Sequence, residues 1–293
     1  MQSFPAPAKI NLHLRVGGIL PDGRHALDTS FAFVDIADRL DIEPATAIEV
    51  SCNRPHLSGP ANLVHRVLEA LAADHGVAMG LKVHIDKQLP EQGGLGGGSS
   101  DAATALWVAN RLWGLDLGSD ELIRFAVPLG ADIPCFLFGE ASLARGVGEQ
   151  LTPYPSPLPD TPIVLAHPGE GLSTAEVFRR FDALHKPPRT DTIAARSEQA
   201  AIGGIAIGEN DLETVACDMS PVLSRMLAAM REHASAAWMS GSGSTCVALV
   251  GDAGQARDLA GELAKHGLAV WTHVGRMRRF HPLRDEDWGV AKR

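Results

Sequence analysis

Cysteine is scarce in this sequence of 293 residues. Its four cysteines, Cys52, Cys135, Cys217 and Cys246, lie far apart, and none forms a C-x-x-C pair. This spacing excludes the common structural zinc motifs and a thioredoxin-like redox motif. We therefore expect reduced, buried thiols, as is usual in cytosolic proteins.

Positive charge and long apolar runs are also lacking. The net charge is −9 at pH 7, so the overall field does not favour nucleic acid as a partner. Arg276, Arg278, Arg279 and Arg284 form the one basic cluster, which is either a solvated surface or a binding patch. No basic-then-apolar leader opens the chain, and the uncharged stretch 234–251 is interrupted by SGSGST. We expect no membrane association and a cytoplasmic location.

The length and the alternation of elements favour two lobes of mixed α+β structure. Apolar residues make up 45% of the chain, which is ample for a core. The patterns predict strands over the first 50 residues and at 81–89, 163–167, 235–239, 245–250 and 268–274. They predict helices at 62–75, 100–113, from a cap at Ser119, 174–184, 220–233 and 253–265. Five prolines in 153–162 suggest a linker. We place the lobes at residues 1–155 and 156–293.

The stretch PEQGGLGGGSSDAA places five glycines within six residues, between a predicted strand and a predicted helix. A glycine-rich backbone leading into a helix N-terminus can direct several N–H groups at one anion. The hydroxyls of Ser99 and Ser100 and the carboxylate of Asp101 add oxygens for phosphate or magnesium contacts. We interpret the stretch as a phosphate-binding loop, the alternative being a tight connection without a ligand. The spacing matches neither the P-loop nor the dinucleotide-binding fingerprint.

Three stretches in this order resemble the motifs of the GHMP kinases, which include galactokinase, homoserine kinase and mevalonate kinase. They are PAKINLHLRV at 7–16, PEQGGLGGGSSDAA at 90–103 and MSGSGSTCVALV at 239–250. The additional stretches DGRHAL and LGADIPCFLFG are similar to a branch of the family that phosphorylates a cytidine-diphosphate-linked sugar alcohol. The resemblance implies a two-lobed kinase of α+β class, with the active site in the cleft between the lobes and with ATP and Mg²⁺ as cofactors.

The resemblance also implies roles for individual residues. Lys9 and Asp132 match the catalytic lysine and aspartate of the family, although the residues alone are equally consistent with a structural ion pair. The nucleotide phosphates should contact Pro90, Glu91, Gln92, Gly93, Gly94, Leu95, Gly96, Gly97, Gly98, Ser99 and Ser100. The adenine should lie near residues 62–64. The ligands of the metal ion are unknown.

The acceptor pocket is expected to include Asn11, Arg24, His25, Phe31, Thr174 and Phe178. By resemblance His25 reads cytosine through hydrogen bonds and Phe178 stacks on it, whereas a turn histidine and core aromatics are the alternatives. The family usually has tyrosine where this chain has Arg24. Its guanidinium plane could stack on the base instead, or it could point into solvent from the turn.

Two other functions remain open at this stage. The chain could be a GHMP kinase with a different alcohol as its acceptor, or a nucleotide-binding module without turnover. DGRHAL and the triple glycine argue against the first, and Lys9 with Asp132 against the second. A monomer or a weak homodimer is expected.

Overall fold

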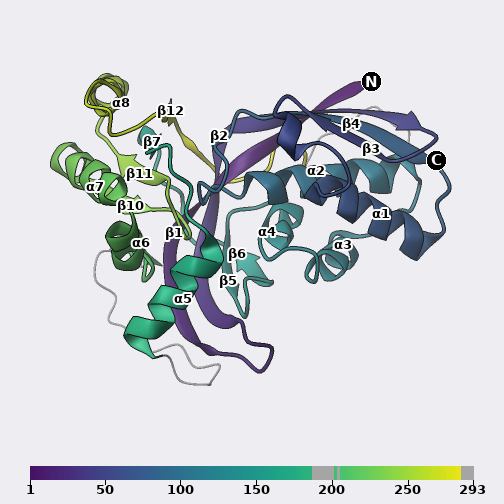
Figure 1. Cartoon of the computed structure of the whole chain (residues 1–293), viewed down its shortest axis with the longest axis horizontal. Helices are drawn as coiled ribbons and strands as arrows, with labels where there is room; N and C mark the ends of the chain where they lie inside the picture. The colour runs from purple at the N-terminus through teal and green to yellow at the C-terminus, as the bar shows by residue number, and fades with distance from the viewer. Residues whose placement is uncertain (187–200, 203–204, 285–293) are drawn as a thin grey trace.

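Two lobes are joined by a pair of long antiparallel strands in the computed structural model (Figure 1). The structure describes residues 1–186, 201–202 and 205–284. The joining strands are β1 (Gln2–Ile19) and β2 (His25–Ala45), and their pairing shifts register near Lys9, His13 and Ile19. The fold class predicted from the sequence is confirmed.

The first lobe packs helices against one face of a mixed sheet. Its sheet runs β3 (Glu49–Cys52), β4 (Gly80–Asp86), β2, β5 (Ser142–Arg145), β6 (Gln150–Pro153), with β1 and β13 (Met277–Arg278) also paired to β2. Its helices are the short 3-10 helix η1 (Pro55–Leu57), α1 (Leu63–His75), α2 (Gly97–Leu112), α3 (Ser119–Ala126) and α4 (Ile133–Phe138). Apolar side chains of α1, α2 and α4 fill the space beneath the sheet, including Leu68, Leu106 and Phe136.

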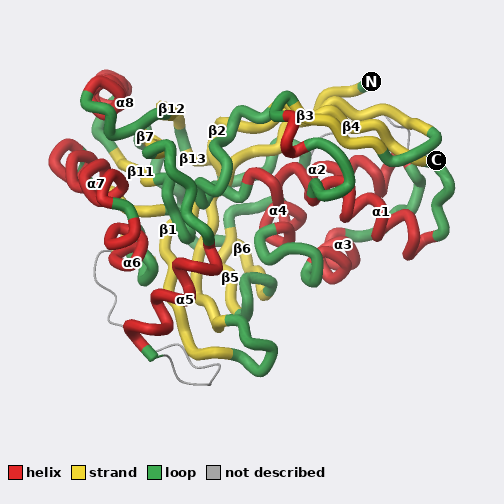
Figure 2. Tube along the Cα trace, viewed as in Figure 1, coloured by secondary structure: helices red, strands yellow, loops and turns green. Residues whose placement is uncertain are grey.

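The second lobe has a separate antiparallel sheet and its own helices (Figure 2). The strand order is β10 (Ala236–Met239), β11 (Cys246–Leu249), β7 (Ile163–His167), β12 (Trp271–Gly275). The helices are α5 (Thr174–His185), α6 (Glu213–Met219), α7 (Pro221–His233) and α8 (Ala253–Lys265), and β8 (Ala201–Ile202) pairs with β9 (Ile205–Ala206). None of the helices in the described ranges is long and apolar enough to cross a bilayer.

A third group of buried apolar side chains joins the lobes. Ile10 and Leu12 of β1 pack with Leu165 of β7 and Trp238 of β10. The indole Nε1 of Trp238 also donates a hydrogen bond of 2.7 Å to the carbonyl oxygen of Asn11. This shared core fixes β1, and the polar residues on it, against the second lobe.

Helix boundaries follow the local capping residues. The Asn62 side chain accepts from the N–H of Val64 at the start of α1, and Ser220 accepts from Leu223 at the start of α7, with Pro221 first in the helix as predicted. The prediction of Ser119 as the cap of α3 is wrong. Gly118 occupies that position, and the Glu121 carboxylate accepts its N–H at 2.8 Å.

Two predicted boundaries near the glycine run are also corrected. The strand predicted at 81–89 ends at Asp86, and the helix predicted from Ser100 already begins at Gly97. The run therefore contributes its last glycines to the first turn of α2. The uncharged stretch 234–251 forms strand, loop and strand, as predicted.

Residues 277–284 return to the first lobe. Strand β13 pairs with Val34 and Phe33 of β2, and Leu283 joins the core of the first lobe. The boundary placed between residues 155 and 156 remains a prediction, because residues 277–284 follow it in the chain but lie in the first lobe.

The arginines at the end of the described chain make ion pairs, Arg279 and Arg284 with Glu140 and Arg276 with Asp160. These pairs favour a structural surface over a binding patch.

Candidate active site

A cavity of about 880 Å³ is lined by residues of both lobes. The glycine run from Pro90 to Ser99 lines it, together with Lys9, Asn11, Phe31, Asp132, Thr174 and Phe178. Most of the predicted site residues are therefore brought together, although they come from distant parts of the sequence. Arg24, His25 and Ser100 are not among the lining residues.

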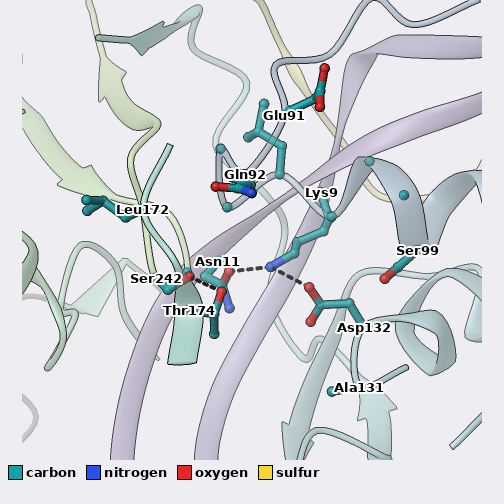
Figure 3. A pocket seen from close by; sticks show the side chains of 18 of the residues that line it. Lys9, Asn11, Glu91, Gln92, Ser99, Ala131, Asp132, Leu172, Thr174 and Ser242 are labelled. Atoms are coloured by element: carbon teal, nitrogen blue, oxygen red, sulfur yellow. Dashed lines mark hydrogen bonds and ion pairs between the residues drawn. The ribbon is translucent and has the colours of Figure 1, made fainter. Parts of the chain in front are cut away.

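Lys9 and Asp132 lie next to each other in the lining of this cavity (Figure 3). The Nζ atom of Lys9 lies 3.5 Å from Oδ2 of Asp132 and donates a hydrogen bond of 2.7 Å to Oδ1 of Asn11. Its ammonium also lies 5.2 Å from the centre of the Phe31 ring. Asp132 is the residue just before α4, and its carboxylate makes no capping bond, so it is available to Lys9 and to a ligand.

Asn11 fixes the orientation of the lysine. Its Nδ2 group donates to Thr29 Oγ1 at 2.9 Å, which directs Oδ1 toward the ammonium of Lys9. Thr29 in turn donates to the carbonyl oxygen of His13. Both asparagine and threonine are buried on the paired strands β1 and β2, so the lysine is held by a short chain of satisfied polar groups.

The carbonyl groups at the start of the glycine run accept hydrogen bonds from residues that pack against the run. Gly93 accepts from the N–H of Thr245 at 3.1 Å, Gly94 from Ser240 Oγ at 3.0 Å, and Leu95 from the N–H of Lys9 at 3.0 Å. In a trans peptide the C=O and the following N–H point in opposite directions. These three bonds therefore turn the N–H groups of residues 94, 95 and 96 away from the residues that hold the carbonyls.

The amide groups of this run have no acceptor among the described residues. The backbone N–H groups from Gly93 to Gly96 donate no hydrogen bond there. Gly97, Gly98 and Ser99 are the first three residues of α2, so their N–H groups have no acceptor one turn back in the helix. Unpaired N–H groups are stable when water or a ligand satisfies them. Their concentration at the start of α2, where the helix dipole is positive, defines a site suited to an anion.

The glycines of the run serve different purposes. Gly94 and Gly96 have φ of 73° and 69°, a conformation that strains other residues. Gly98 has no such φ, and a Cβ atom there would meet nothing within 4 Å. The backbone of this protein therefore does not require glycine at 98, and the space that a side chain would fill remains open to a ligand.

Two of the oxygens expected near phosphate have other partners. Ser100 is fully buried, and its hydroxyl donates to the carbonyl oxygen of Pro7 at 2.7 Å. Asp101 is buried and accepts from Lys87 Nζ at 2.8 Å. The interpretation of Ser100 as a phosphate or metal ligand is wrong for its hydroxyl, because the second residue of the pair faces β1. Ser99 lines the cavity (Figure 3).

His25 and Phe178 form a contact at the other end of the site. Their rings stack with centroids 5.0 Å apart and an angle of 28° between the planes. Nε2 of His25 lies 2.7 Å from Oδ1 of Asp182, which is one turn beyond Phe178 on α5. Thr174 Oγ1, at the start of the same helix, lies 2.8 Å from Ser242 Oγ.

Arg24 does not reach this contact. Its guanidinium pairs with Asp22 at 2.7 Å, and its Nε donates to the same carboxylate at 2.8 Å. The side chain is 49% exposed on the turn between β1 and β2. The hypothesis that Arg24 replaces a stacking tyrosine is therefore not supported by the geometry, since Asp22 holds the guanidinium on the turn.

Sequence reasoning missed several residues that build the site. Lys87 lines the cavity and contacts both Asp38 and Asp101, and Ser240 connects Asn11 N–H to the Gly94 carbonyl. Lys87 had a usable signal, because a lysine lies a few residues before the glycine run. The serines of SGSGST were noted as interrupting an uncharged stretch and as part of a motif that resembles the family, but none was named as a site residue. Of the residues proposed for adenine, Asn62 and Leu63 line the cavity and Val64 does not.

Both lobes match known families. The GHMP kinases N terminal domain matches residues 62–140, and the GHMP kinases C terminal domain matches residues 194–268. The chain belongs to the GHMP kinases, a family of small-molecule kinases.

Two relatives of this chain bear the name of the same kinase. A 4-diphosphocytidyl-2-C-methyl-D-erythritol kinase of Cupriavidus metallidurans is 40% identical over 250 residues, covering 84% of this chain and 83% of the relative. The kinase of the same name from a Nocardioides species is 40% identical over 283 residues, covering 90% and 94%.

The solved structures agree with the fold. A crystal structure of 4-(cytidine 5'-diphospho)-2C-methyl-D-erythritol kinase superposes with a TM-score of 0.76 at 33% identity, covering 94% of this chain and 99% of that chain. A mevalonate kinase superposes with a TM-score of 0.66 at 13% identity, which shows the shared fold alone.

Proposed function

We propose that this kinase transfers the γ-phosphoryl group of ATP to the 2-hydroxyl of 4-diphosphocytidyl-2-C-methyl-D-erythritol, a step in non-mevalonate isoprenoid precursor synthesis. The observation that supports it most directly is the Lys9–Asp132 pair, which faces one continuous cavity between the glycine run and the Thr174–Phe178 segment. The relatives at 40% identity bear the name of this activity over most of the chain.

The phosphates of ATP occupy the glycine run. The unused N–H groups of residues 93–99 supply donors, and the open space beside Gly98 admits the phosphate chain. Magnesium in kinases is bound mainly through phosphate oxygens and water, with few protein oxygens. The described residues contain no cluster of three or more histidine, cysteine, aspartate or glutamate side chains, which is consistent with that mode. Ser99 would contribute the hydroxyl from α2.

Asp132 takes the proton of the acceptor hydroxyl, and Lys9, which lies 3.5 Å from this carboxylate, offsets phosphate charge. Phosphoryl transfer depends on positioning and on electrostatic stabilisation more than on covalent chemistry by the protein. A half-exposed carboxylate beside a buried ammonium meets these needs, because the carboxylate can reach a substrate while the cation stays fixed.

The cytosine end of the acceptor lies at His25 and Phe178. Phe178 offers a ring face for stacking, and Asp182 binds Nε2 of His25, which leaves Nδ1 free of any partner within the described residues. If Nε2 carries the proton shared with Asp182, Nδ1 accepts a hydrogen bond, and cytosine presents an amino group as donor. Uracil presents an acceptor there instead.

The test is a coupled assay of ATP turnover with a panel of alcohols. The cytidine-diphosphate-linked acceptor should give the highest kcat/KM, above its uridine analogue, homoserine and mevalonate. Highest turnover with another alcohol would point to a different GHMP acceptor. ATP binding without turnover on any of them would indicate a nucleotide-binding module. A cytoplasmic location, and a monomer or weak homodimer, complete the proposal.

A further inference from the structure

Three charged side chains meet behind the glycine run. Lys87 Nζ contacts Asp38 Oδ2 and lies 2.8 Å from Asp101 Oδ2. The three side chains are nearly excluded from solvent, with exposed fractions of 6% for Lys87, 0% for Asp38 and 4% for Asp101. We call Asp38, Lys87 and Asp101 the buried triad.

The buried triad connects the elements on which the glycine run depends. Asp38 lies on β2, Lys87 directly follows β4, and Asp101 lies in α2. The other carboxylate oxygen of Asp38 accepts from the N–H groups of Gln88 and Leu89 at 2.6 and 2.9 Å. Asp38 therefore holds both the side chain and the main chain of the segment that enters the run.

The ammonium of Lys87 lies directly against the backbone of the run. A Cβ atom at Gly97 would come within 3.1 Å of Lys87 Nζ and 3.4 Å of Asp38 Oδ2. Gly97 is the first residue of α2, so the contact fixes where the helix begins relative to the loop. Its requirement for glycine comes from the buried triad on the inner side, whereas Gly98 faces open space.

Stability alone does not account for this arrangement. Buried ion pairs lose about as much in desolvation as they gain in attraction, and apolar side chains of similar size often hold the same elements more firmly. Here two carboxylates share one ammonium, and Oδ1 of Asp101 is buried without a hydrogen-bond partner among the described residues. A buried group left in this state calls for a role other than stability.

We propose that the buried triad positions the glycine run for ATP, with Lys87 and Asp101 as its positioning residues. This inference rests on the nucleotide site proposed above. With the ammonium in place, β2, the entry to the run and the first turn of α2 have one fixed spacing, and the free N–H groups converge on the phosphates. Without it, α2 can shift against the loop, and the same donors no longer point at one anion.

The experiment compares Lys87→Met, Asp101→Asn and the double variant with the wild type. Calorimetric titration with a non-hydrolysable ATP analogue gives nucleotide affinity, steady-state kinetics give KM for ATP and for the acceptor, and a thermal melt gives Tm. Each single variant should weaken ATP binding about tenfold or more, equivalent to about 1.4 kcal/mol. KM for the acceptor should change less than KM for ATP.

Leu71→Ala is the matched control, since Leu71 is fully buried in α1 and does not line the cavity. It should lower Tm without changing nucleotide affinity. Lys87→Met leaves two buried carboxylates without a cation, whereas the double variant leaves one, Asp38. The Tm of the double variant should therefore recover in part from that of Lys87→Met, while its ATP affinity stays low. Recovery of both would overturn the positioning role, as would a loss of affinity in Leu71→Ala equal to that of the triad variants.

Two further outcomes separate this inference from the proposed function. If Lys87→Met does not fold, Asp101→Asn is the deciding variant, because it keeps the Lys87–Asp38 pair. Unchanged ATP affinity in Asp101→Asn would refute the positioning role of the buried triad. A wild-type protein that fails to bind the ATP analogue would refute the nucleotide site itself.

Discussion

Lys9 and Asp132 are 3.5 Å apart, yet their exposure to solvent is very different, with 3% of the lysine side chain and 40% of the aspartate side chain accessible. The cation is enclosed by Asn11 and Phe31, whereas the carboxylate opens into the cavity. A structural ion pair needs no such asymmetry. A fixed cation beside an accessible carboxylate suits a carboxylate that contacts a substrate.

Asp132→Asn should lower kcat by about 10²–10⁴-fold, because the amide keeps the size of the side chain but accepts no proton. Affinity for the ATP analogue should stay near wild type, since the proposed phosphate donors lie in the glycine run. Single-turnover kinetics beside a calorimetric titration measure the two effects. Near-normal turnover would exclude Asp132 as the proton acceptor.

Lys9→Met should also reduce kcat strongly, because the ammonium beside Asp132 is lost while the length of the buried stem is kept. Steady-state kinetics with saturating ATP measure kcat, and a calorimetric titration with the ATP analogue checks that the nucleotide still binds. Wild-type turnover in Lys9→Met would mean that Lys9 takes no part in the transfer.

Gly98→Ala should weaken binding of the ATP analogue about tenfold, although the protein itself leaves room for the methyl group. Gly261→Ala is the control, because Gly261 also lies in a helix with nothing within 4 Å of its Cβ position and is remote from the cavity. Alanine favours a helix over glycine by about 1 kcal/mol, so neither change should lower Tm. Equal affinity in both variants would place the phosphates elsewhere.

The structure brings most of the predicted site residues to one cavity, whereas the path of the chain around that cavity was predicted less well. Lys9 and Asn11 were named through the family resemblance, which short contiguous motifs carry, and their roles stay predictions. Helix α4 was missed, because IPCFLF is a short, wholly apolar run that has no amphipathic period. The return of residues 277–284 to the first sheet was missed too, since β13 is two residues long and depends on pairing with distant β2.

The hydrogen-bond and ion-pair partners of individual side chains were also hard to predict from the sequence. A serine pair at a helix start gives no indication of which hydroxyl faces a ligand, and helix geometry turned Ser100 toward Pro7. The pairing of Lys87 with Asp38 and Asp101 joins residues 49 and 14 positions apart, so no local pattern could predict it. The pairing of Arg24 with Asp22 is different, because the two residues are close neighbours within the turn, and the sequence could have indicated this competition for the guanidinium.

The pH dependence of stability should report on Asp101. Burial, and then the nearby charge of Asp38, raise the pKa of this carboxyl to about 7, against the attraction of Lys87. The folded state therefore holds the proton more tightly than the unfolded state does. This contribution to the free energy of unfolding is complete below about pH 4 and is lost as the pH rises to about 7.

Asp101→Asn removes that titration and resembles the protonated carboxyl in shape. The Tm of the variant relative to wild type should therefore rise between pH 4 and pH 7.5, the range that spans the raised pKa of about 7. Asp258→Asn, at an exposed position on α8, serves as the control and should show a flat difference. A flat difference for Asp101→Asn as well would show that the carboxyl does not titrate in this range.

His25 and Arg24 are neighbours in the sequence, but their side chains have different partners. His25 is held by Phe178 and Asp182, whereas Arg24 is held by Asp22 in solvent. His25→Ala should raise KM for the cytidine-diphosphate-linked acceptor by an amount typical of a base contact, about 1–3 kcal/mol, with a smaller effect on kcat. Arg24→Ala should leave KM unchanged, and Arg24→Tyr should not improve it. Steady-state kinetics with saturating ATP measure all three. A raised KM in Arg24→Ala that Arg24→Tyr restores would show that the guanidinium leaves Asp22 to stack on the base when the acceptor binds.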